Sequence, residues 1–153
     1  MKKLRIYIDM DGVIADFDKA AKQKAIEKGV SKLTRPDLYV DYLYLDVIEG
    51  AEEAVKYLHE HHEVFIASTP PWSRIQCWAD KRAWLERWFP DLKRKLILTH
   101  RKDLLIGDVL IDDSRFRGQP DFKGHWFWFN KDWENKNWKA CLEFIKKLEN
   151  EEI

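Results

Sequence analysis

Residues 4–12 read LRIYIDMDG, an apolar run that ends in two aspartates and a glycine. Residues 109–113 repeat this arrangement as VLIDD, in which a second apolar run ends in a pair of aspartates. Short apolar runs of this kind are typical of strands that are buried on both faces of a parallel sheet. The carboxyl ends of such strands share one edge of the sheet, so we expect the four aspartates to lie close together.

Three more apolar runs have the length of buried strands, and helical patterns lie between them. The runs cover residues 64–67, 96–99 and 126–129, and apolar residues recur at helical spacing from Ala51 and again after a cap at Asp132. Strands that alternate with helices predict an α/β fold around one sheet. We therefore expect a Rossmann-like parallel sheet flanked by helices.

About 55 residues separate the first two strands, far more than one crossover helix requires. One helix is predicted over residues 14–30, and the aromatic stretch that follows it has no clear periodicity. We therefore expect a small, mainly helical cap over residues 15–48, inserted after the first strand. The core domain would then consist of residues 1–14 and 49–153.

The composition describes a soluble, folded chain. It has 153 residues, of which 27 are basic and 27 acidic, and 45% of them are hydrophobic. The hydrophobic content excludes disorder, and the zero net charge argues against a general affinity for nucleic-acid polymers or membrane surfaces. Cys77 and Cys141 lack the spacing of a metal or redox motif, so we expect packed thiols and a cytoplasmic location.

The four aspartates predict a magnesium site. Carboxylates gathered at one sheet edge repel one another unless a cation is present, and Mg²⁺ prefers oxygen ligands and often shares substrate phosphate oxygens. The alternative is that each aspartate pair only caps a helix or a turn. Asp108 precedes the strand that Asp112 ends, about 13 Å away at the opposite edge of the sheet, so it is not expected to be a ligand.

Four motifs, in order along the chain, resemble those of the haloacid dehalogenase-like phosphohydrolases. They are DMDGVIADFD at 9–18, FIASTPP at 65–71, LILTHRKD at 96–103 and VLIDD at 109–113. With KRAWLERWF at 81–89, the chain is similar over nearly its whole length to the 5′(3′)-deoxyribonucleotidases. It departs from that family in having STPP where T-S-P is more common, and its cap is shorter than in the mammalian members. The second departure bears on the nucleobase preference.

The resemblance implies a Mg²⁺-dependent phosphatase that hydrolyses nucleoside monophosphates, preferably deoxyribonucleotides, through an aspartyl-phosphate intermediate. Asp9 would attack phosphorus, and Asp11 would protonate the leaving group and then deprotonate the hydrolytic water. The metal would be bound by Asp9, by Asp11 through its backbone carbonyl, and by either Asp112 or Asp113.

Hydroxyl and ammonium groups are expected to hold the phosphate. Ser68 matches the second motif and Thr69 adds a second hydroxyl, although a Ser-Thr pair is otherwise common in turns. Lys102 matches the third motif, and on chemistry alone its neighbours His100 and Arg101 compete with it.

Lys81 is the second expected phosphate-binding lysine and has an argument of its own. Helical spacing places it on the same side as Trp78, Leu85 and Trp88, where a solvated lysine gains nothing. The alternative is that its stem lies along the aromatic rings while its charge reaches water. The family places a phosphate-binding lysine at the matching position, which favours a functional role.

Three aromatic residues are candidates for the nucleobase pocket. Phe17 lies on the first turn after the acid/base loop and matches a family position that stacks on the base. Tyr42 and Tyr44 would complete the pocket, with packing inside the cap as the alternative.

Two other functions compete with this interpretation. The divergent cap allows a phosphatase for another small phosphomonoester, such as a sugar phosphate. A non-catalytic binding module is opposed by the intact acidic motifs. The expected partner is a small phosphomonoester, and a nucleoside or deoxynucleoside monophosphate is favoured. Binding to a nucleic-acid polymer or to a membrane is not expected. A homodimer is the candidate assembly.

Overall fold

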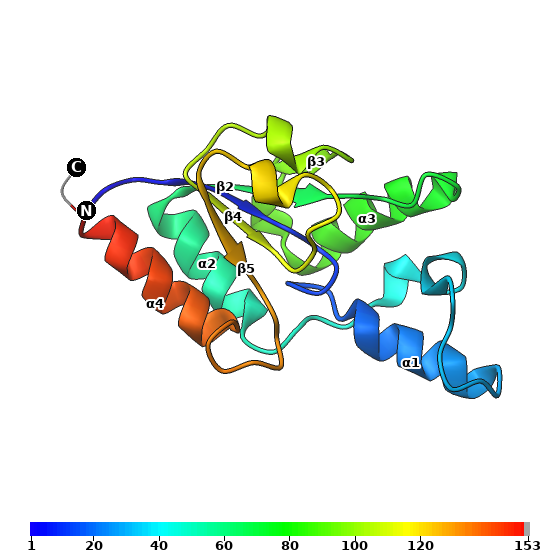
Figure 1. The fold of residues 1–153 in the computed structure, drawn as a ribbon. Coiled ribbons are helices and arrows are strands. Elements are labelled where there is room, and N and C mark those ends of the chain that lie inside the picture. Colours follow the sequence, from blue (N-terminus) through cyan, green and yellow to red (C-terminus); the bar gives the residue numbers. More distant parts are fainter. Residues whose placement is uncertain (152–153) are drawn as a thin grey trace.

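The central sheet decides the position of every other element. The computed structural model describes residues 1–151, in which five parallel strands lie in the order β3-β2-β1-β4-β5 (Figure 1). The strands are β1 (Arg5–Ile8), β2 (Glu63–Ser68), β3 (Leu96–Leu98), β4 (Val109–Asp112) and β5 (His125–Trp128). Each lies where an apolar run predicted it, so the Rossmann-like α/β sheet is confirmed.

The register of the central strands sets the position of the site. Ile8 on β1 pairs with Ile66 on β2 and with Ile111 on β4. These side chains are fully buried, as expected for strands covered on both faces. Asp9 and Asp112, the next residues along β1 and β4, therefore leave the sheet side by side at its carboxyl edge.

Three helices contribute to the larger of two hydrophobic cores. They are α2 (Ala51–His61), α3 (Ile75–Trp88) and α4 (Trp138–Glu149), and each buries an apolar stripe. Cys77 on α3 and Cys141 on α4 are buried and free, as predicted. The smaller core, around Tyr7, Leu110 and Phe122, lies under the 3₁₀ turns of the β3–β4 and β4–β5 connections. None of the helices within residues 1–151 combines the length and the apolar character that crossing a membrane requires.

The predicted start of α4 is wrong. The helix is capped by Asn137, whose side chain accepts a hydrogen bond from Ala140 N (3.1 Å), and not by Asp132. Asp132 instead lies in a turn in which its backbone N–H donates to the Asn130 side chain (3.0 Å). Aspartate and asparagine are both favoured at helix N-termini. Asp132 does not cap α4 because it lies in the turn before the helix.

α1 is shorter than the helix predicted over residues 14–30. It spans Phe17–Glu27 and is capped by Asp16. The residues before it are not helical because the backbone N–H groups of residues 13–15 all donate to the Met10 carbonyl, which closes a tight turn after Asp9. The chain leaves the helix at Gly29, whose φ of 70° favours glycine.

Residues 15–48 form a segment near the end of β1 (Figure 1). It contains α1 and two 3₁₀ turns, at Pro36–Leu38 and Tyr42–Tyr44. Side chains from the sheet-and-helix core hold it: Trp84 on α3 donates to the Leu45 carbonyl (2.8 Å), and Arg74 donates to the carbonyls of Asp37 and Val40. The division into cap and core stays a prediction.

Candidate active site

Three carboxylates converge at the carboxyl edge of the sheet. Asp9 follows β1, and Asp112 and Asp113 lie at the end of β4. One oxygen from each carboxylate lies within 4.8 Å of the other two. Asp9 and Asp112 are buried, whereas Asp113 is exposed. Asp108 lies at the opposite end of β4, where it accepts a hydrogen bond from Arg5 N (2.7 Å), as expected for a residue outside the cluster.

Lys102 forms ion pairs with two of these carboxylates. Its buried ammonium donates to Asp112 Oδ2 (2.6 Å), to Asp9 Oδ1 (3.2 Å) and to the Ala67 carbonyl (2.8 Å). Burial opposes the charge on Lys102, but the two carboxylates outweigh this effect and raise the pKa of the lysine. All three ammonium protons thus have partners within the chain.

The two residues that competed with Lys102 have other partners. The His100 ring Nε2 lies 3.0 Å from the Pro70 carbonyl oxygen, and Arg101 forms an ion pair with Asp103 (2.7 Å). Of the three basic residues in this loop, Lys102 is therefore the one that reaches the acids.

The carboxylates disfavour one another's ionisation. Burial and the neighbouring Asp112 raise the pKa of Asp9 well above its usual range. Asp113 is open to solvent on its pocket side, but the protein atoms packed around its carboxylate reduce its hydration, and this effect, together with the charges of Asp112 and Asp11, raises its pKa to about 6. One lysine does not balance three acids, and a cation among these oxygens would remove the repulsion. The donor set consists of oxygen alone and fits Mg²⁺.

Asp112 and Asp113 differ in what their oxygens already bind. Asp112 Oδ2 accepts from Lys102, and its Oδ1 accepts from Ser114 N (3.0 Å). Both oxygens of Asp112 therefore hold other parts of the site in place. Asp113 is the member of the pair that faces the pocket with an exposed carboxylate.

Asp11 turns toward α3. Its Oδ2 accepts a hydrogen bond from Lys81 Nζ (2.8 Å), and the Lys81 side chain is fully buried, so the prediction that α3 turns this lysine inward is confirmed. The ammonium also lies 4.9 Å from the centre of the Tyr42 ring. Asp11 Oδ1 is buried and finds no hydrogen-bond partner among residues 1–151.

The two hydroxyls at the end of β2 are in different states. Thr69 Oγ1 donates to the Thr99 carbonyl (2.7 Å), so its proton is in use. The Ser68 hydroxyl is buried and has no partner in the part of the chain that the structure describes. Leaving a buried hydroxyl unpaired costs about 1–3 kcal/mol. Ser68 therefore holds an unused donor at the end of β2, although it is not among the residues that line the pocket above the acids.

Gly12 shapes the loop between Asp11 and the segment that follows. Its φ of 84° lies in the left-handed region that favours glycine. A Cβ at this position would also overlap Asp113 Oδ2. Position 12 therefore has to be glycine both for the turn and for the acid that lies beside it.

A pocket of about 450 Å³ opens over these groups. Its lining includes the acids, Lys102, Thr69 and Phe17. The Phe17 ring lies 5.6 Å from the ring of Tyr42, which is buried, and burial raises the pKa of that tyrosine. Tyr44 is 69% exposed. Among the described residues, neither tyrosine lines the pocket, so Phe17 is the predicted base-binding residue that the fold brings to the acids.

Comparison with known proteins identifies the family. A family model described as "5' nucleotidase, deoxy (Pyrimidine), cytosolic type C protein" matches residues 27–137. The chain belongs to this family. These deoxyribonucleotidases form part of the haloacid dehalogenase-like superfamily, so the resemblance drawn from the motifs is confirmed.

Relatives of this deoxyribonucleotidase-family chain come from viruses, bacteria and animals. A protein of Vibrio phage KVP40, provisionally named a 5'(3')-deoxyribonucleotidase, is 32% identical over 142 residues, which cover 92% of this chain and 83% of the relative. The mitochondrial 5'(3')-deoxyribonucleotidase of Mus musculus is 27% identical, and the matched region covers 97% of this chain and 78% of the mouse protein. The cytosolic type of Homo sapiens is 27% identical, with shares of 78% and 76%.

The pocket of this family member also contains residues that the sequence did not single out. Ser114, Phe116, Arg117 and Gln119 line it from the loop that follows β4. The one signal in the sequence is that they come directly after the Asp112-Asp113 pair. No periodicity marks a loop, so their exposure and direction required the structure.

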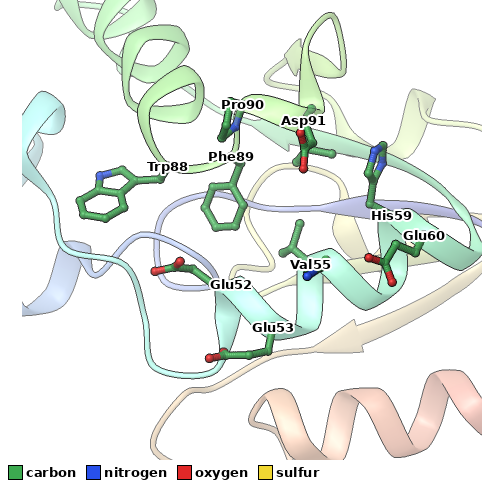
Figure 2. Close-up of a pocket in the computed structure, with 11 residues that line it drawn as sticks. Glu52, Glu53, Val55, His59, Glu60, Trp88, Phe89, Pro90 and Asp91 are labelled. Atoms are coloured by element: carbon green, nitrogen blue, oxygen red, sulfur yellow. The ribbon is translucent and has the colours of Figure 1, made fainter.

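A second hollow, of about 380 Å³, lies between α2 and the end of α3 (Figure 2). Phe89 and Val55 give it an apolar wall, and Glu52, Glu60 and Asp91 lie around it. The predicted site residues all lie within residues 1–151, and none of them lines this hollow. The pocket over Asp9 is lined by the predicted acids, Thr69, Lys102 and Phe17, whereas Ser68 and Lys81 are buried and do not belong to its lining.

Proposed function

We propose that this chain is a Mg²⁺-dependent phosphatase that hydrolyses deoxyribonucleoside monophosphates through a phosphorylated Asp9. One observation carries the proposal: the Asp9 carboxylate, Asp113 and buried Lys102 meet in one pocket of a chain that belongs to a deoxyribonucleotidase family. The pocket supplies the groups that phosphate transfer needs, and the names of the relatives support the class of substrate.

The metal ligands would be Asp9, Asp113 and the backbone carbonyl of Asp11. Asp113 is favoured over Asp112 because both oxygens of Asp112 already accept hydrogen bonds, from Lys102 and from Ser114 N. The raised pKa values of Asp9 and Asp113 support a cation at this position. When bound, Mg²⁺ would supply positive charge to the phosphate oxygens and to Asp9.

In the first step, an Asp9 oxygen attacks phosphorus. A bond forms between this oxygen and phosphorus while the bond from phosphorus to the ester oxygen breaks. Asp11 gives its proton to the departing oxygen, and the nucleoside leaves with a hydroxyl group. The hydrogen bond from Lys81 holds the Asp11 carboxyl in a fixed direction during this transfer.

In the second step, Asp11 is ionised and takes a proton from a water molecule. The water oxygen attacks phosphorus, and the bond between phosphorus and Asp9 breaks. Inorganic phosphate leaves, the Asp9 carboxylate is restored, and Asp11 is again protonated. One pair of aspartates therefore serves both halves of the reaction.

The phosphate itself would be held by hydroxyl and ammonium groups at the sheet edge. Ser68 has a proton without a partner among the described residues and would donate it to a phosphate oxygen. Thr69 would assist once its bond to Thr99 is exchanged. Lys102 and Lys81, each bound to an aspartate, would balance the charge that the phosphate brings.

Residues 15–48 would act as the cap that recognises the base, with residues 1–14 and 49–153 as the core. Phe17 would stack on the base, supported by the tilted contact with Tyr42, and Tyr44 would approach from its exposed position. A cytoplasmic location and a homodimer stay predictions.

A phosphate-release screen tests the proposal. The substrates are 5′- and 3′-monophosphates of deoxyribonucleosides and ribonucleosides, with sugar phosphates alongside. We expect the highest kcat/KM for a deoxyribonucleotide, no activity in EDTA, recovery with Mg²⁺, and little recovery with Ca²⁺, whose looser coordination fits an in-line transfer poorly. Preference for a sugar phosphate would overturn the substrate class, and full activity in EDTA would overturn the metal.

A further inference from the structure

Phe116 is an exposed aromatic residue at the catalytic pocket. It lies in the loop after β4 and is 73% exposed, yet it lines the same pocket as Asp9, Asp113 and Phe17. A phenyl ring in water is unfavourable, and a ligand that covers it gains the free energy of burying its surface. Its position over the reacting carboxylates separates it from apolar side chains scattered on the rest of the surface.

The loop that carries Phe116 is fixed by hydrogen bonds to Asp112 and to the backbone of Lys102. Ser114 N donates to Asp112 Oδ1 (3.0 Å), and Phe116 N donates to Ser114 Oγ (3.2 Å). Lys102 N donates to the Arg117 carbonyl (2.7 Å). The backbone of the loop is therefore tied on one side to Asp112 and on the other to the turn of Lys102, and this places Phe116 at the pocket.

Two buried or crowded residues complete this fixation. Gln119 is buried, and its Oε1 accepts from Arg117 N (2.7 Å). Gly118 has a φ of 89°, and a Cβ there would overlap the Asp103 carboxylate. The chain therefore presents Phe116 in a prepared position, which lowers the entropic cost of ligand binding.

The surroundings of Phe116 indicate what covers it. The Arg115 guanidinium lies 5.3 Å from the centre of the Phe116 ring, and Arg117 donates from Nη1 to the Phe116 carbonyl (2.9 Å). An aromatic ring with one guanidinium beside it and a second on its own backbone carbonyl suits a flat heterocycle that carries carbonyl oxygens, attached to an anion. The pocket already contains a second phenyl ring, that of Phe17 on α1.

We propose that Phe116 is a second stacking residue for the nucleobase, so that base recognition is shared between α1 and the loop that follows the Asp112-Asp113 pair. This inference rests on the proposed function, because the base belongs to the leaving nucleoside. It assigns the loop after β4 two tasks: Asp113 serves the reacting phosphate, and Phe116 serves the group that departs.

The test compares substrates with and without a base in the wild type, Phe116→Ala and Phe116→Tyr. Steady-state kinetics are measured with a deoxyribonucleoside 5′-monophosphate and with 2-deoxyribose 5-phosphate. We expect Phe116→Ala to raise KM for the nucleotide roughly 5- to 150-fold, the range that loss of one stacking contact produces, with kcat little changed. KM for the sugar phosphate should stay within about twofold, since no base is present. Phe116→Tyr keeps the ring and should restore the nucleotide KM.

Ile106→Ala is the matched control, because Ile106 is 78% exposed and does not belong to the residues described as lining the pocket. It should leave both KM values unchanged. An equal rise of KM for both substrates in Phe116→Ala, or no rise for either, would overturn the inference while leaving the proposed function intact. A wild-type protein that hydrolyses the sugar phosphate and no nucleotide would overturn the proposed function and this inference together.

Discussion

The buried ammonium of Lys81 lies 2.8 Å from Asp11 Oδ2, and the two residues are 70 positions apart in the sequence. Lys81 reaches the carboxyl from α3, with the Tyr42 ring 4.9 Å from its charge. A charge without access to water needs its partner, so the direction of the Asp11 carboxyl depends on this pair. Proton transfer in the proposed reaction thus depends on a residue outside the acidic cluster.

Lys81→Met keeps the length of the side chain and removes the charge. Asp11 then loses its fixed direction, so we expect kcat for a deoxyribonucleotide to fall roughly 10- to 100-fold, a partial loss of the roughly 100- to 10,000-fold that general acid catalysis contributes. p-Nitrophenyl phosphate, whose leaving group needs little protonation, should lose less. The measurement is kcat and KM for both substrates. A rise in KM that is equal for both, with kcat unchanged, would show that Lys81 serves the phosphate charge alone and does not orient Asp11.

Lys139→Met is the control for the removal of a lysine. Lys139 is exposed on α4 and is not among the residues that line the pocket over Asp9. Its kinetic constants should match those of the wild type, and a loss of activity in this variant would mean that general surface charge matters.

Ser68→Ala and Thr69→Val should separate the two hydroxyls. Ser68→Ala removes an unpaired buried group, so stability should be unchanged or slightly raised, while inhibition by inorganic phosphate should weaken. Thr69→Val breaks the bond to the Thr99 carbonyl and should lower stability by about 1 kcal/mol. Thermal denaturation and phosphate inhibition constants check both effects. The opposite pattern would assign the free donor to Thr69.

Asp9→Asn and Asp11→Asn should differ in the intermediate that they form. Asp9→Asn removes the attacking anion, so no phosphorylated protein should appear. Asp11→Asn keeps it, and a substrate with a good leaving group, such as acetyl phosphate, should phosphorylate Asp9 while hydrolysis lags for want of a base. Intact-mass analysis after rapid acid quench detects the adduct. An active Asp9→Asn variant without adduct would favour direct attack by water.

Stabilisation by Mg²⁺ should depend on pH. The pKa of Asp113 is raised to about 6, so below this pH the folded protein holds a proton that the metal must displace. In EDTA, the same raised pKa makes stability fall as pH rises from about 4 to about 6, because the folded state binds the proton more tightly than the unfolded chain. The increase in Tm caused by Mg²⁺ should therefore be small near pH 5 and larger near pH 7.5.

Asp113→Asn is the matched variant for the pH measurement. It removes the titrating carboxyl, so the Mg²⁺-induced rise in Tm should shrink at every pH and lose its step near pH 6. A rise in Tm that is equal at both pH values in the wild type would show that Asp113 does not hold the metal.

The positions of the acids and of Lys81 were accessible from the sequence because both follow from regular geometry. An aspartate directly after a buried strand must leave at the carboxyl edge of the sheet, and this places Asp9 and Asp113 together. The period of a helix turns Lys81 inward, and its side chain is buried as expected. In both cases one repeated distance along the chain determines the direction of the side chain.

Other parts of the site depend on contacts that no local pattern encodes. The sequence gives no means of telling that the Thr69 proton is used by Thr99 while Ser68 keeps its own. The pairing of Lys81 with Asp11 joins distant segments. Phe116 lies in a loop whose direction is set by hydrogen bonds to Ser114 and Lys102 rather than by periodicity. The cap of α4 was predicted at the wrong residue because the side chains of both Asp132 and Asn137 can accept a hydrogen bond at a helix N-terminus.

Gly12 has a consequence for any attempt to rebuild this site in another protein. The Asp113 carboxylate occupies the space that a side chain at position 12 would need. The two residues lie about a hundred positions apart in the sequence. The aspartate-rich turn after β1 and the acidic pair after β4 are therefore complementary in shape as well as in charge. A design that transfers one of these two segments to another protein has to transfer the other as well, in the same relative position. Otherwise the glycine and the aspartate will not fit together.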